Sequence, residues 1–269
     1  MSHHLVEVQD LHYAYPDGHQ ALAGVTARIT HGESVGIVGA NGAGKSTLLW
    51  HLVGVLFPAR GSVRIGDCPV TKQTLLRIRR SIGMVFQNPD DQLFMPTVHD
   101  DVAFGPLNLR LPPDEVERRV TRALETVGAA HLEDRPPYKL SGGEKRLAAI
   151  AAVLAMEPDI LVMDEPSAGL DPLARRCLIQ LLADFAQTKI VATHDLDLVL
   201  DLCRRTIVLS EGRVIADGPT ETIFGDEALL ARGHLEKPLR MQACPVCGGK
   251  TRPGEIVPGA KQVGFEADA

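Results

Sequence analysis

One stretch of the sequence decides the fold, and it reads Gly39-Ala40-Asn41-Gly42-Ala43-Gly44-Lys45-Ser46-Thr47. It matches the pattern G-x-x-x-x-G-K-[ST], which is typical of a loop that binds phosphate groups. Gly42 and Gly44 have no Cβ atom, so the backbone can wrap closely around a polyphosphate and direct its N–H groups inward. The Lys45 ammonium supplies charge for the β- and γ-phosphates, and the Ser46 hydroxyl suits a Mg²⁺ ion that bridges them.

The residues on either side of this loop support the same interpretation. Residues 34–38 read as a buried strand that enters the loop, and residues 46–52 read as a helix that leaves it. The N-terminus of that helix, which carries the positive end of the helix dipole, would face the bound anion. The alternative is a glycine-rich turn that matches the pattern by chance, and the flanking strand and helix argue against it.

Composition and charge exclude several classes of protein. The chain has 269 residues, of which 45% are hydrophobic and 23% charged, as in an ordinary folded protein with a sizeable core. Its longest strongly apolar run, residues 147–156, is shorter than the roughly 20 residues that cross a bilayer, and residues 1–5 carry no secretory signal. Any membrane role is therefore expected to come through a partner. The net charge of -6 argues weakly against a nucleic-acid surface.

The order of apolar segments predicts an α/β fold with a parallel-sheet core. Residues 5–30 alternate apolar and polar positions around turn signals, which indicates an N-terminal antiparallel β layer. Beyond this layer, short apolar strands alternate with amphipathic helices, as in a parallel α/β sheet. The strands of this sheet are expected at residues 34–38, 82–86, 159–163, 188–192 and 205–210.

The same pattern predicts the domain organisation. Residues 95–156 carry helical patterns only, so we expect an α-helical subdomain inserted into the core. One domain is expected over residues 1–235. Residues 236–269 are rich in Pro, Gly and Lys without periodicity, which indicates a loosely ordered C-terminal tail.

Two carboxylates follow the strand expected at residues 159–163. Asp164 and Glu165 stand at its end, where an acidic side chain can join the coordination shell of Mg²⁺, and Asp164 fits this role. Glu165 comes next along the extended chain and faces a different way, so it can polarise a water molecule for in-line attack on the γ-phosphate. The structural alternative is a solvated strand end or the N-cap of the next helix.

A helix with an unusual start lies in the expected subdomain. Residues 140–144 read Leu-Ser-Gly-Gly-Glu, and Ser141 and Glu144 match a capping box. Gly142 and Gly143 would also let a phosphate approach the helix N-terminus, so the two interpretations are compatible. Because this helix start lies away from its own phosphate loop, it could complete the site of a second chain. That geometry predicts a head-to-tail dimer with two ATP molecules at the interface.

Taken together, these motifs resemble those of the ATP-binding-cassette ATPases. The resemblance runs in order over roughly residues 5–230 and includes two further segments. These segments read Ser167-Ala168-Gly169-Leu170-Asp171 and Ala192-Thr193-His194-Asp195. The resemblance implies a P-loop fold, hydrolysis of ATP, and ATP and Mg²⁺ as ligands.

The resemblance also implies which residues bind the nucleotide. Tyr15 would stack on adenine, and residues 39–47 would hold the phosphates, with Ser46 on the metal ion. Ser141, Gly142 and Gly143 would contact the γ-phosphate bound by a partner chain.

Catalytic roles follow from the same resemblance. Gln87, after the strand expected at residues 82–86, would reach the Mg²⁺ ion and the attacking water. Asp164 would hold the metal, and Glu165 would be the catalytic base. Asp171 would couple the two sites of a dimer, and His194 would contact the γ-phosphate as a switch.

The resemblance is less direct at Glu144 and at Tyr15. Glu144 stands where the family usually has glutamine, and a carboxylate near a phosphate is unfavourable unless it turns away. We therefore expect Glu144 to serve the capping box rather than to contact ATP. Tyr13 lies two residues from Tyr15 on the same face of a strand. It therefore stays open whether Tyr15 contacts the adenine or packs in the core.

Segments around residue 87 narrow the resemblance. The runs Gln87-Asn88-Pro89-Asp90-Asp91-Gln92-Leu93-Phe94 and Asp100 to Pro106 resemble the ATPase of energy-coupling-factor importers. These importers take up vitamins or transition-metal ions through separate membrane subunits. Residues 154–158 and 192–200 are most similar to the cobalt/nickel branch, and a vitamin such as biotin is the alternative solute.

This narrower resemblance implies a place in the cell and a partner. The chain would be a peripheral protein on the cytoplasmic face of the cell membrane. A groove near Gln87 to Phe94 would receive the integral membrane subunits, although plain core packing is the alternative for Leu93 and Phe94. A cassette ATPase that acts on nucleic acid is a more distant alternative. The acidic balance, the single cassette and the lack of a long coiled coil argue against it, so we expect no nucleic-acid partner.

The expected tail carries one further pair of candidate ligands. Cys244 and Cys247 form a C-x-x-C turn, which is half of a tetrahedral thiolate site. Two chains of a dimer could supply four thiolates, and His234 is a remote third ligand. The alternative is a tail with two free thiols.

Overall fold

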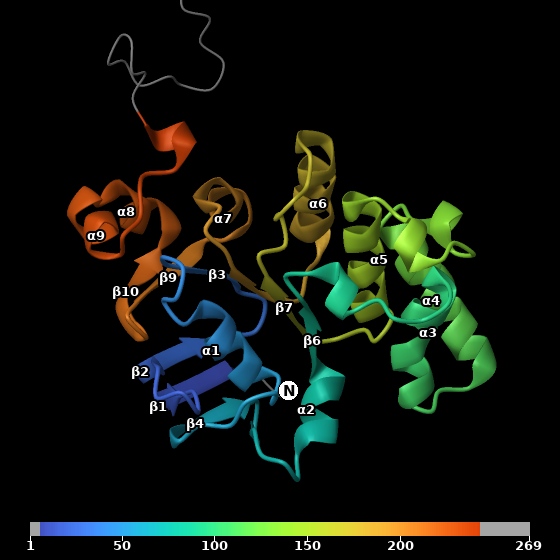
Figure 1. Cartoon of the computed structure of the whole chain (residues 1–269), viewed down its shortest axis with the longest axis horizontal. Helices are drawn as coiled ribbons and strands as arrows, with labels where there is room; N and C mark the ends of the chain where they lie inside the picture. The colour runs from blue at the N-terminus through green and yellow to red at the C-terminus, as the bar shows by residue number, and fades with distance from the viewer. Residues whose placement is uncertain (1–5, 243–269) are drawn as a thin grey trace, which may run out of the picture.

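Two β-sheets form the centre of the molecule (Figure 1). The structure is a computed structural model that describes residues 6–242. The smaller sheet has the strand order β2-β1-β4-β5 and is antiparallel, and the larger has the order β10-β9-β3-β8-β7-β6. The strands are β1 Val6–Ala14, β2 Gln20–Ile29, β3 Ser34–Val38, β4 Arg60–Ile65, β5 Cys68–Pro69, β6 Ile82–Val85, β7 Ile160–Asp164, β8 Thr188–Ala192, β9 Arg205–Ser210 and β10 Arg213–Pro219.

The larger sheet is parallel except at one edge. β3 lies between β8 and β9 and pairs with both in parallel, and β7 joins β8 to β6 in the same sense. β10, which the sequence prediction does not include, adds an antiparallel edge strand through a tight hairpin with β9. Its residues are mostly half-buried or exposed and include Gly218 and Pro219, so it lacks the apolar run that identifies the inner strands.

The sheets are flanked by helices of very different length. The helices are α1 Lys45–Leu52, α2 Leu75–Ser81, α3 Val98–Asn108, α4 Pro113–Thr126, α5 Gly142–Leu154, α6 Pro172–Asp184, α7 Leu196–Leu202, α8 Thr220–Gly225 and α9 Glu227–Arg232. Short 3-10 helices are η1 Pro89–Asp91, η2 Ala130–Leu132, η3 Pro137–Lys139 and η4 Leu239–Met241. Among residues 6–242, no helix has both the length and the apolar character that a bilayer crossing needs.

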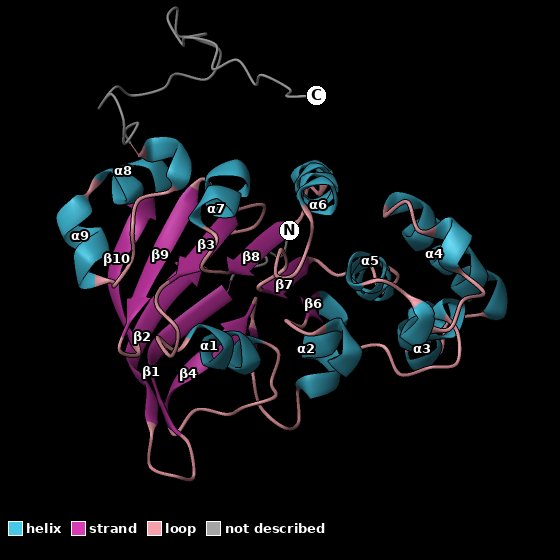
Figure 2. Cartoon of the chain, turned by 45° about the horizontal axis from the view of Figure 1, so that its top comes forward, coloured by secondary structure: helices cyan, strands magenta, loops and turns pink. Residues whose placement is uncertain are grey.

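Each face of the larger sheet has its own apolar core. On one face, α1 packs between the two sheets, and Leu48, Leu49 and Leu52 of this helix are buried with residues of both. On the other face, α6 and α7 cover β3, β7 and β8 (Figure 2). Burial on both faces explains why the inner strands are short, continuous apolar runs.

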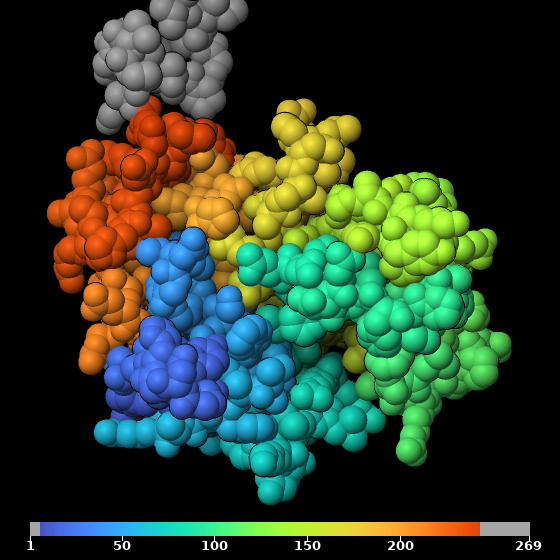
Figure 3. Space-filling view, viewed as in Figure 1, coloured from blue at the N-terminus to red at the C-terminus, as the bar shows by residue number. Residues whose placement is uncertain are grey.

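Helices α3, α4 and α5 form the subdomain that the sequence predicts over residues 95–156. In the space-filling view this green part of the chain is a lobe beside the sheets (Figure 3). In α4, Val116, Val120 and Leu124 face the shared core, as the spacing predicts. Gly105 of α3 lies so close to Met156 that a Cβ atom would collide with the methionine sulfur. Within the subdomain, α3 is therefore closely packed against the residues that follow α5.

The first residues of the expected tail contact α7. The Arg240 guanidinium binds Asp197 at 3.2 Å and Asp201 at 2.8 Å, and Lys237 pairs with Glu227 at 2.6 Å. These ion pairs hold the chain up to residue 242 against the core.

Candidate active site

The loop from residue 39 to residue 47 forms a cradle at the C-terminal end of β3. Gly42 and Gly44 have φ angles of 79° and 101°, in the left-handed region that favours glycine. A Cβ atom on Gly44 would lie 2.5 Å from the Ala21 carbonyl oxygen, so the close approach to β2 also requires glycine. α1 begins at Lys45, directly after this turn, and its N-terminus faces the cradle.

Lys45 closes the cradle from inside. Its Nζ donates to the carbonyl oxygens of Gly39 at 2.8 Å and Ala40 at 3.1 Å. Burial lowers the pKa of the Lys45 ammonium, and the charges of Glu165 and Asp164 oppose this shift. The ammonium is therefore held over the loop in a position where a polyphosphate would meet it.

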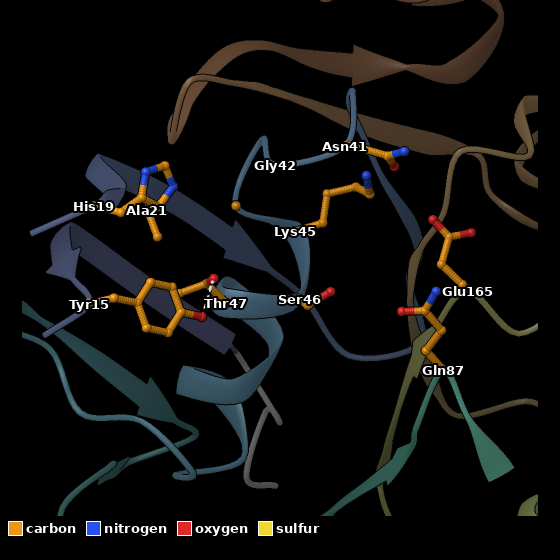
Figure 4. A pocket seen from close by; sticks show the side chains of 11 residues that line it. Tyr15, His19, Ala21, Asn41, Gly42, Lys45, Ser46, Thr47, Gln87 and Glu165 are labelled. Atoms are coloured by element: carbon orange, nitrogen blue, oxygen red, sulfur yellow. Dashed lines mark hydrogen bonds between the residues drawn. The ribbon is translucent and has the colours of Figure 1, made fainter. Parts of the chain in front are cut away.

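A pocket of about 220 Å³ opens above the cradle (Figure 4). It brings together several residues predicted from sequence: Tyr15, Asn41, Gly42, Gly44, Lys45, Ser46, Thr47, Gln87 and Glu165. His19 and Ala21 also line it. Sequence reasoning missed His19, although its place just after the turn at residues 15–18 could have put it opposite Tyr15.

The two tyrosines of β1 and the following turn have different surroundings. Tyr15 lines the pocket, and its hydroxyl lies 3.0 Å from Thr47 Oγ1. Tyr13 instead packs edge-on against Tyr15 and against the buried His51, with ring centroids 5.2 Å and 4.8 Å apart. Tyr13 therefore packs beside Tyr15 and does not line the pocket.

Asp164 has the surroundings expected of a metal ligand. Its side chain is buried at the end of β7, and Oδ1 has no hydrogen-bond partner within residues 6–242. Burial raises the pKa of the Asp164 carboxyl and the charge of Glu165 adds to this, whereas the Ser46 hydroxyl, Lys45 and Arg146 oppose it. An unpartnered carboxylate oxygen beside a serine hydroxyl fits Mg²⁺, which prefers oxygen ligands.

Glu165 directly follows β7 and has an unusual backbone conformation. Its φ angle of 45° is unusual for a residue other than glycine, and such strain is concentrated at functional sites. Thr193 Oγ1 donates to Glu165 Oε2 at 2.8 Å. The His194 backbone N–H donates to Glu165 Oε1 at 3.1 Å, and His194 Nδ1 lies 2.8 Å from the same oxygen. The end of β7 is thus tied to the residues that follow β8.

The loop that carries His194 is anchored from α6. Arg175 binds the Asp195 carboxylate through two nitrogens, at 2.9 Å and 3.0 Å, and Ser167 donates to the same group at 3.2 Å. Asp171 accepts from the Ala174 N–H at 2.8 Å and so caps α6. The His194 side chain itself is two-thirds exposed.

Ser141, Gly142 and Gly143 do not line the pocket. The capping box expected at the start of α5 is present: Ser141 Oγ accepts from the Glu144 N–H at 3.3 Å, and Glu144 Oε2 accepts from the Ser141 N–H at 2.7 Å. Arg135 holds the same carboxylate at 3.2 Å. Glu144 is therefore engaged within its own helix, and the start of α5 lies on the surface apart from the chain's own phosphate loop (Figure 1).

Cys244 and Cys247 lie outside the described residues. Within residues 6–242, no group of three or more His, Cys, Asp or Glu side chains could hold a metal ion, and this range includes His234.

Comparison with known proteins gives the same family for sequence and fold. Residues 22–168 match the family described as ABC transporter. An ABC transporter ATP-binding protein of Geobacter sulfurreducens is 69% identical, over 92% of this chain and 100% of that protein. The energy-coupling factor transporter ATP-binding protein EcfA of Methanothermobacter thermautotrophicus is 45% identical, over 98% of this chain and 82% of that protein.

Solved structures are similar over most of the chain. CbiO1 of Clostridium perfringens, described as part of the ABC transporter complex CbiONQ, matches with a TM-score of 0.75 at 42% identity. The match covers 86% of this chain and 94% of that one. A dimeric ATP-binding cassette in a post-hydrolysis state, bound to ADP and Pi, matches with a TM-score of 0.73 at 29% identity, over 80% of this chain and 98% of that one.

Proposed function

Because the chain belongs to the ABC transporter family and is an ATP-hydrolysing cassette, we propose that it drives a membrane importer for cobalt or nickel ions. Support comes from the 45% identity to EcfA, from the fold shared with CbiO1, and from the resemblance of residues 154–158 and 192–200 to the cobalt/nickel branch. A vitamin such as biotin is the alternative solute. The acidic net charge of -6 disfavours a cassette that acts on nucleic acid.

The chemistry of the proposed reaction is carried by side chains of the pocket. Ser46, Asp164 and Gln87 would hold Mg²⁺. When bound, this ion neutralises charge on the β- and γ-phosphates. The Glu165 carboxylate accepts a proton from the attacking water at Oε1 or Oε2. In the described geometry His194 Nδ1 lies 2.8 Å from Oε1, so a turn of His194 toward the γ-phosphate would release the base.

A second copy of the chain is the proposed partner at the nucleotide. The start of α5, with Ser141 to Gly143, does not line its own pocket. A head-to-tail pair would bring this start to the other copy's γ-phosphate, where helix N–H groups favour an anion. The similarity to a dimeric cassette supports this arrangement.

An apolar groove beside Gln87 is the observation that best supports a membrane partner. The groove holds about 270 Å³ and is lined by residues of β6, α3 and α5 and by the segment between β6 and α3. Phe94 and Phe104 are 63% and 42% exposed, and their rings meet edge to face at 4.9 Å. The buried Asp101 carboxylate accepts the N–H groups of Phe94 and Met95 and so holds this rim in place. We propose that a helix of an integral membrane subunit fills the groove, which makes the chain a peripheral protein of the cytoplasmic face.

Replacing Phe94 tests the groove. The Phe94→Ala variant removes an exposed ring that would be buried by the partner helix, so co-purification with the membrane subunits is expected to fall by about tenfold or more. ATP hydrolysis by the isolated chain should stay within about twofold of the wild type, because Phe94 does not line the nucleotide pocket. Leu239→Ala is the matched control, since Leu239 is 76% exposed and lies outside the groove. Undiminished co-purification of Phe94→Ala would place the partner elsewhere.

Uptake of radiolabelled Co²⁺ and Ni²⁺ tests the proposed solute. Cells that express the chain with its membrane subunits should accumulate the metal, and cells with the Glu165→Gln variant should not. If neither metal is taken up while the ATPase is active and membrane-bound, the metal assignment is wrong. Uptake of labelled biotin in the same cells would then identify the vitamin alternative.

A further inference from the structure

A buried arginine links α5 to the segment that carries Gln87. Arg146 lies on the second turn of α5 and is 2% exposed. Its Nη1 donates to the Phe86 carbonyl oxygen at 2.6 Å, and its Nη2 donates to the Gln87 carbonyl oxygen at 2.5 Å. The planar fork of the guanidinium thus grips two consecutive peptide groups just after β6.

This arrangement is not one that stability alone would favour. Arg146 Nε has no hydrogen-bond partner among the described residues, and a buried guanidinium with an unused donor is unfavourable. Burial lowers the pKa of the Arg146 guanidinium, and the charge of Asp164 partly offsets the shift. An apolar side chain would avoid these penalties but would leave the Phe86 and Gln87 carbonyl oxygens without these donors, so the specific gain from the guanidinium is its hold on two peptide groups.

Two further contacts join the same segment to α5. Gln92 Nε2 donates to the Ala149 carbonyl oxygen at 2.7 Å, and Gln92 Oε1 accepts from the Phe86 N–H at 3.2 Å. Lys145 pairs with Asp90 at 2.6 Å. Residues 86–92 and α5 are therefore connected at three places.

The segment held by these contacts carries the Gln87 side chain. This side chain faces Glu165 across one side of the pocket (Figure 4). Holding the Phe86 and Gln87 carbonyl oxygens fixes the two peptide planes that flank the Gln87 Cα atom, and these planes set the direction in which the side chain leaves the backbone. Arg146 is only five positions after Ser141, or about one and a half helical turns.

From these contacts we propose that Arg146 is a positioning residue that makes the place of Gln87 in the pocket depend on the position of α5. This proposal rests on the dimer described under the proposed function. When the start of α5 engages the partner's nucleotide, a shift of the helix moves the Phe86 and Gln87 peptides with it. One chain's Gln87 therefore responds to the nucleotide bound by the other chain.

A double-mutant cycle tests the proposal on the purified full chain. Arg146→Met keeps most of the volume and removes both donors. Alone it is expected to lower kcat about tenfold or more and to leave the KM for ATP within about twofold. In a Gln87→Ala background the same change should lower kcat less than twofold further, because its effect passes through Gln87. Independent losses that multiply in the double variant would overturn the proposal.

Hydrogen exchange provides a readout that does not require turnover. Amides of residues 86–92 should exchange about tenfold faster in nucleotide-free Arg146→Met, while those of β7 keep the wild-type rate. Unchanged exchange in residues 86–92 would contradict the proposal. Arg122→Met is the control, since the Arg122 side chain is exposed and its guanidinium pairs with Glu157 at the surface.

A conservative variant covers the case in which Arg146→Met does not fold. Arg146→Lys keeps the charge but can grip fewer carbonyl groups, so it should give intermediate kcat and intermediate exchange. Wild-type values in Arg146→Lys would show that the forked grip is not needed. None of these measurements involves the transported solute or a membrane subunit, so they stand apart from the uptake experiment.

Discussion

The Glu165→Gln variant is expected to lose at least about 100-fold in kcat, because an amide cannot accept the proton of the attacking water. Binding of ATP should persist, since the phosphate cradle and Lys45 are unchanged. The variant should therefore accumulate as an ATP-dependent dimer, which size-exclusion chromatography with and without Mg-ATP can detect. Turnover would be measured as phosphate release at saturating ATP.

A matched control separates chemistry from backbone strain in this experiment. Glu211 also has a positive φ angle, 48°, but lies exposed in the turn between β9 and β10 and outside the pocket. Glu211→Gln should keep wild-type kcat. Near-normal turnover in Glu165→Gln would show that another group acts as the base, and a variant that stays monomeric at saturating Mg-ATP would count against the proposed dimer.

The Asp164→Asn variant should fold but should no longer respond to Mg²⁺. The variant keeps the shape of the side chain and removes the charge that Mg²⁺ needs, so kcat is expected to fall about 1000-fold. In thermal melts, ATP alone should raise the Tm of both proteins, and Mg²⁺ should raise it further only in the wild type. The exposed Asp184 supplies the control variant Asp184→Asn, which should respond to Mg²⁺ like the wild type.

The raised pKa of Asp164 sets the sign of a pH effect in the same experiment. Because the folded-state pKa lies above the ordinary value of 3.8, the folded chain retains a proton that the unfolded chain has lost. The contribution of Asp164 to the free energy of unfolding therefore decreases as pH rises through this window. Asp164→Asn lacks this decrease, so without nucleotide at neutral pH its Tm should equal or exceed that of the wild type. A lower Tm would contradict the unpartnered state of Oδ1.

The inner strands of the larger sheet could be predicted because their signal is local. Strands expected at residues 34–38, 188–192 and 205–210 have the same bounds as β3, β8 and β9. Each is a short apolar run that is buried on both faces. β5 has only two residues, and β10 is largely half-buried or exposed, so neither carries such a run.

In the candidate site, too, some residues could be predicted from the sequence and others could not. The phosphate loop is a contiguous motif, so its residues could be identified without any long-range information. The bonds from Thr193 and His194 to Glu165 join positions 28 and 29 residues apart, and the grip of Arg146 on Gln87 spans 59. No spacing rule along the sequence indicates such contacts, because they depend on how strands and helices are ordered in space.

The order of the strands in the larger sheet also determines when, during synthesis, the phosphate loop gains its neighbouring strands. β3 and its loop leave the ribosome early, but the strands on both sides of β3 are β8 and β9, which follow the whole helical subdomain. Gly39 packs against the backbone of Leu209, so the loop itself leans on β9. A nascent chain that stops short of β8 leaves β3 with two bare edges, a state prone to aggregate. The loop that decides the fold is thus among the first parts to be made and among the last able to bind.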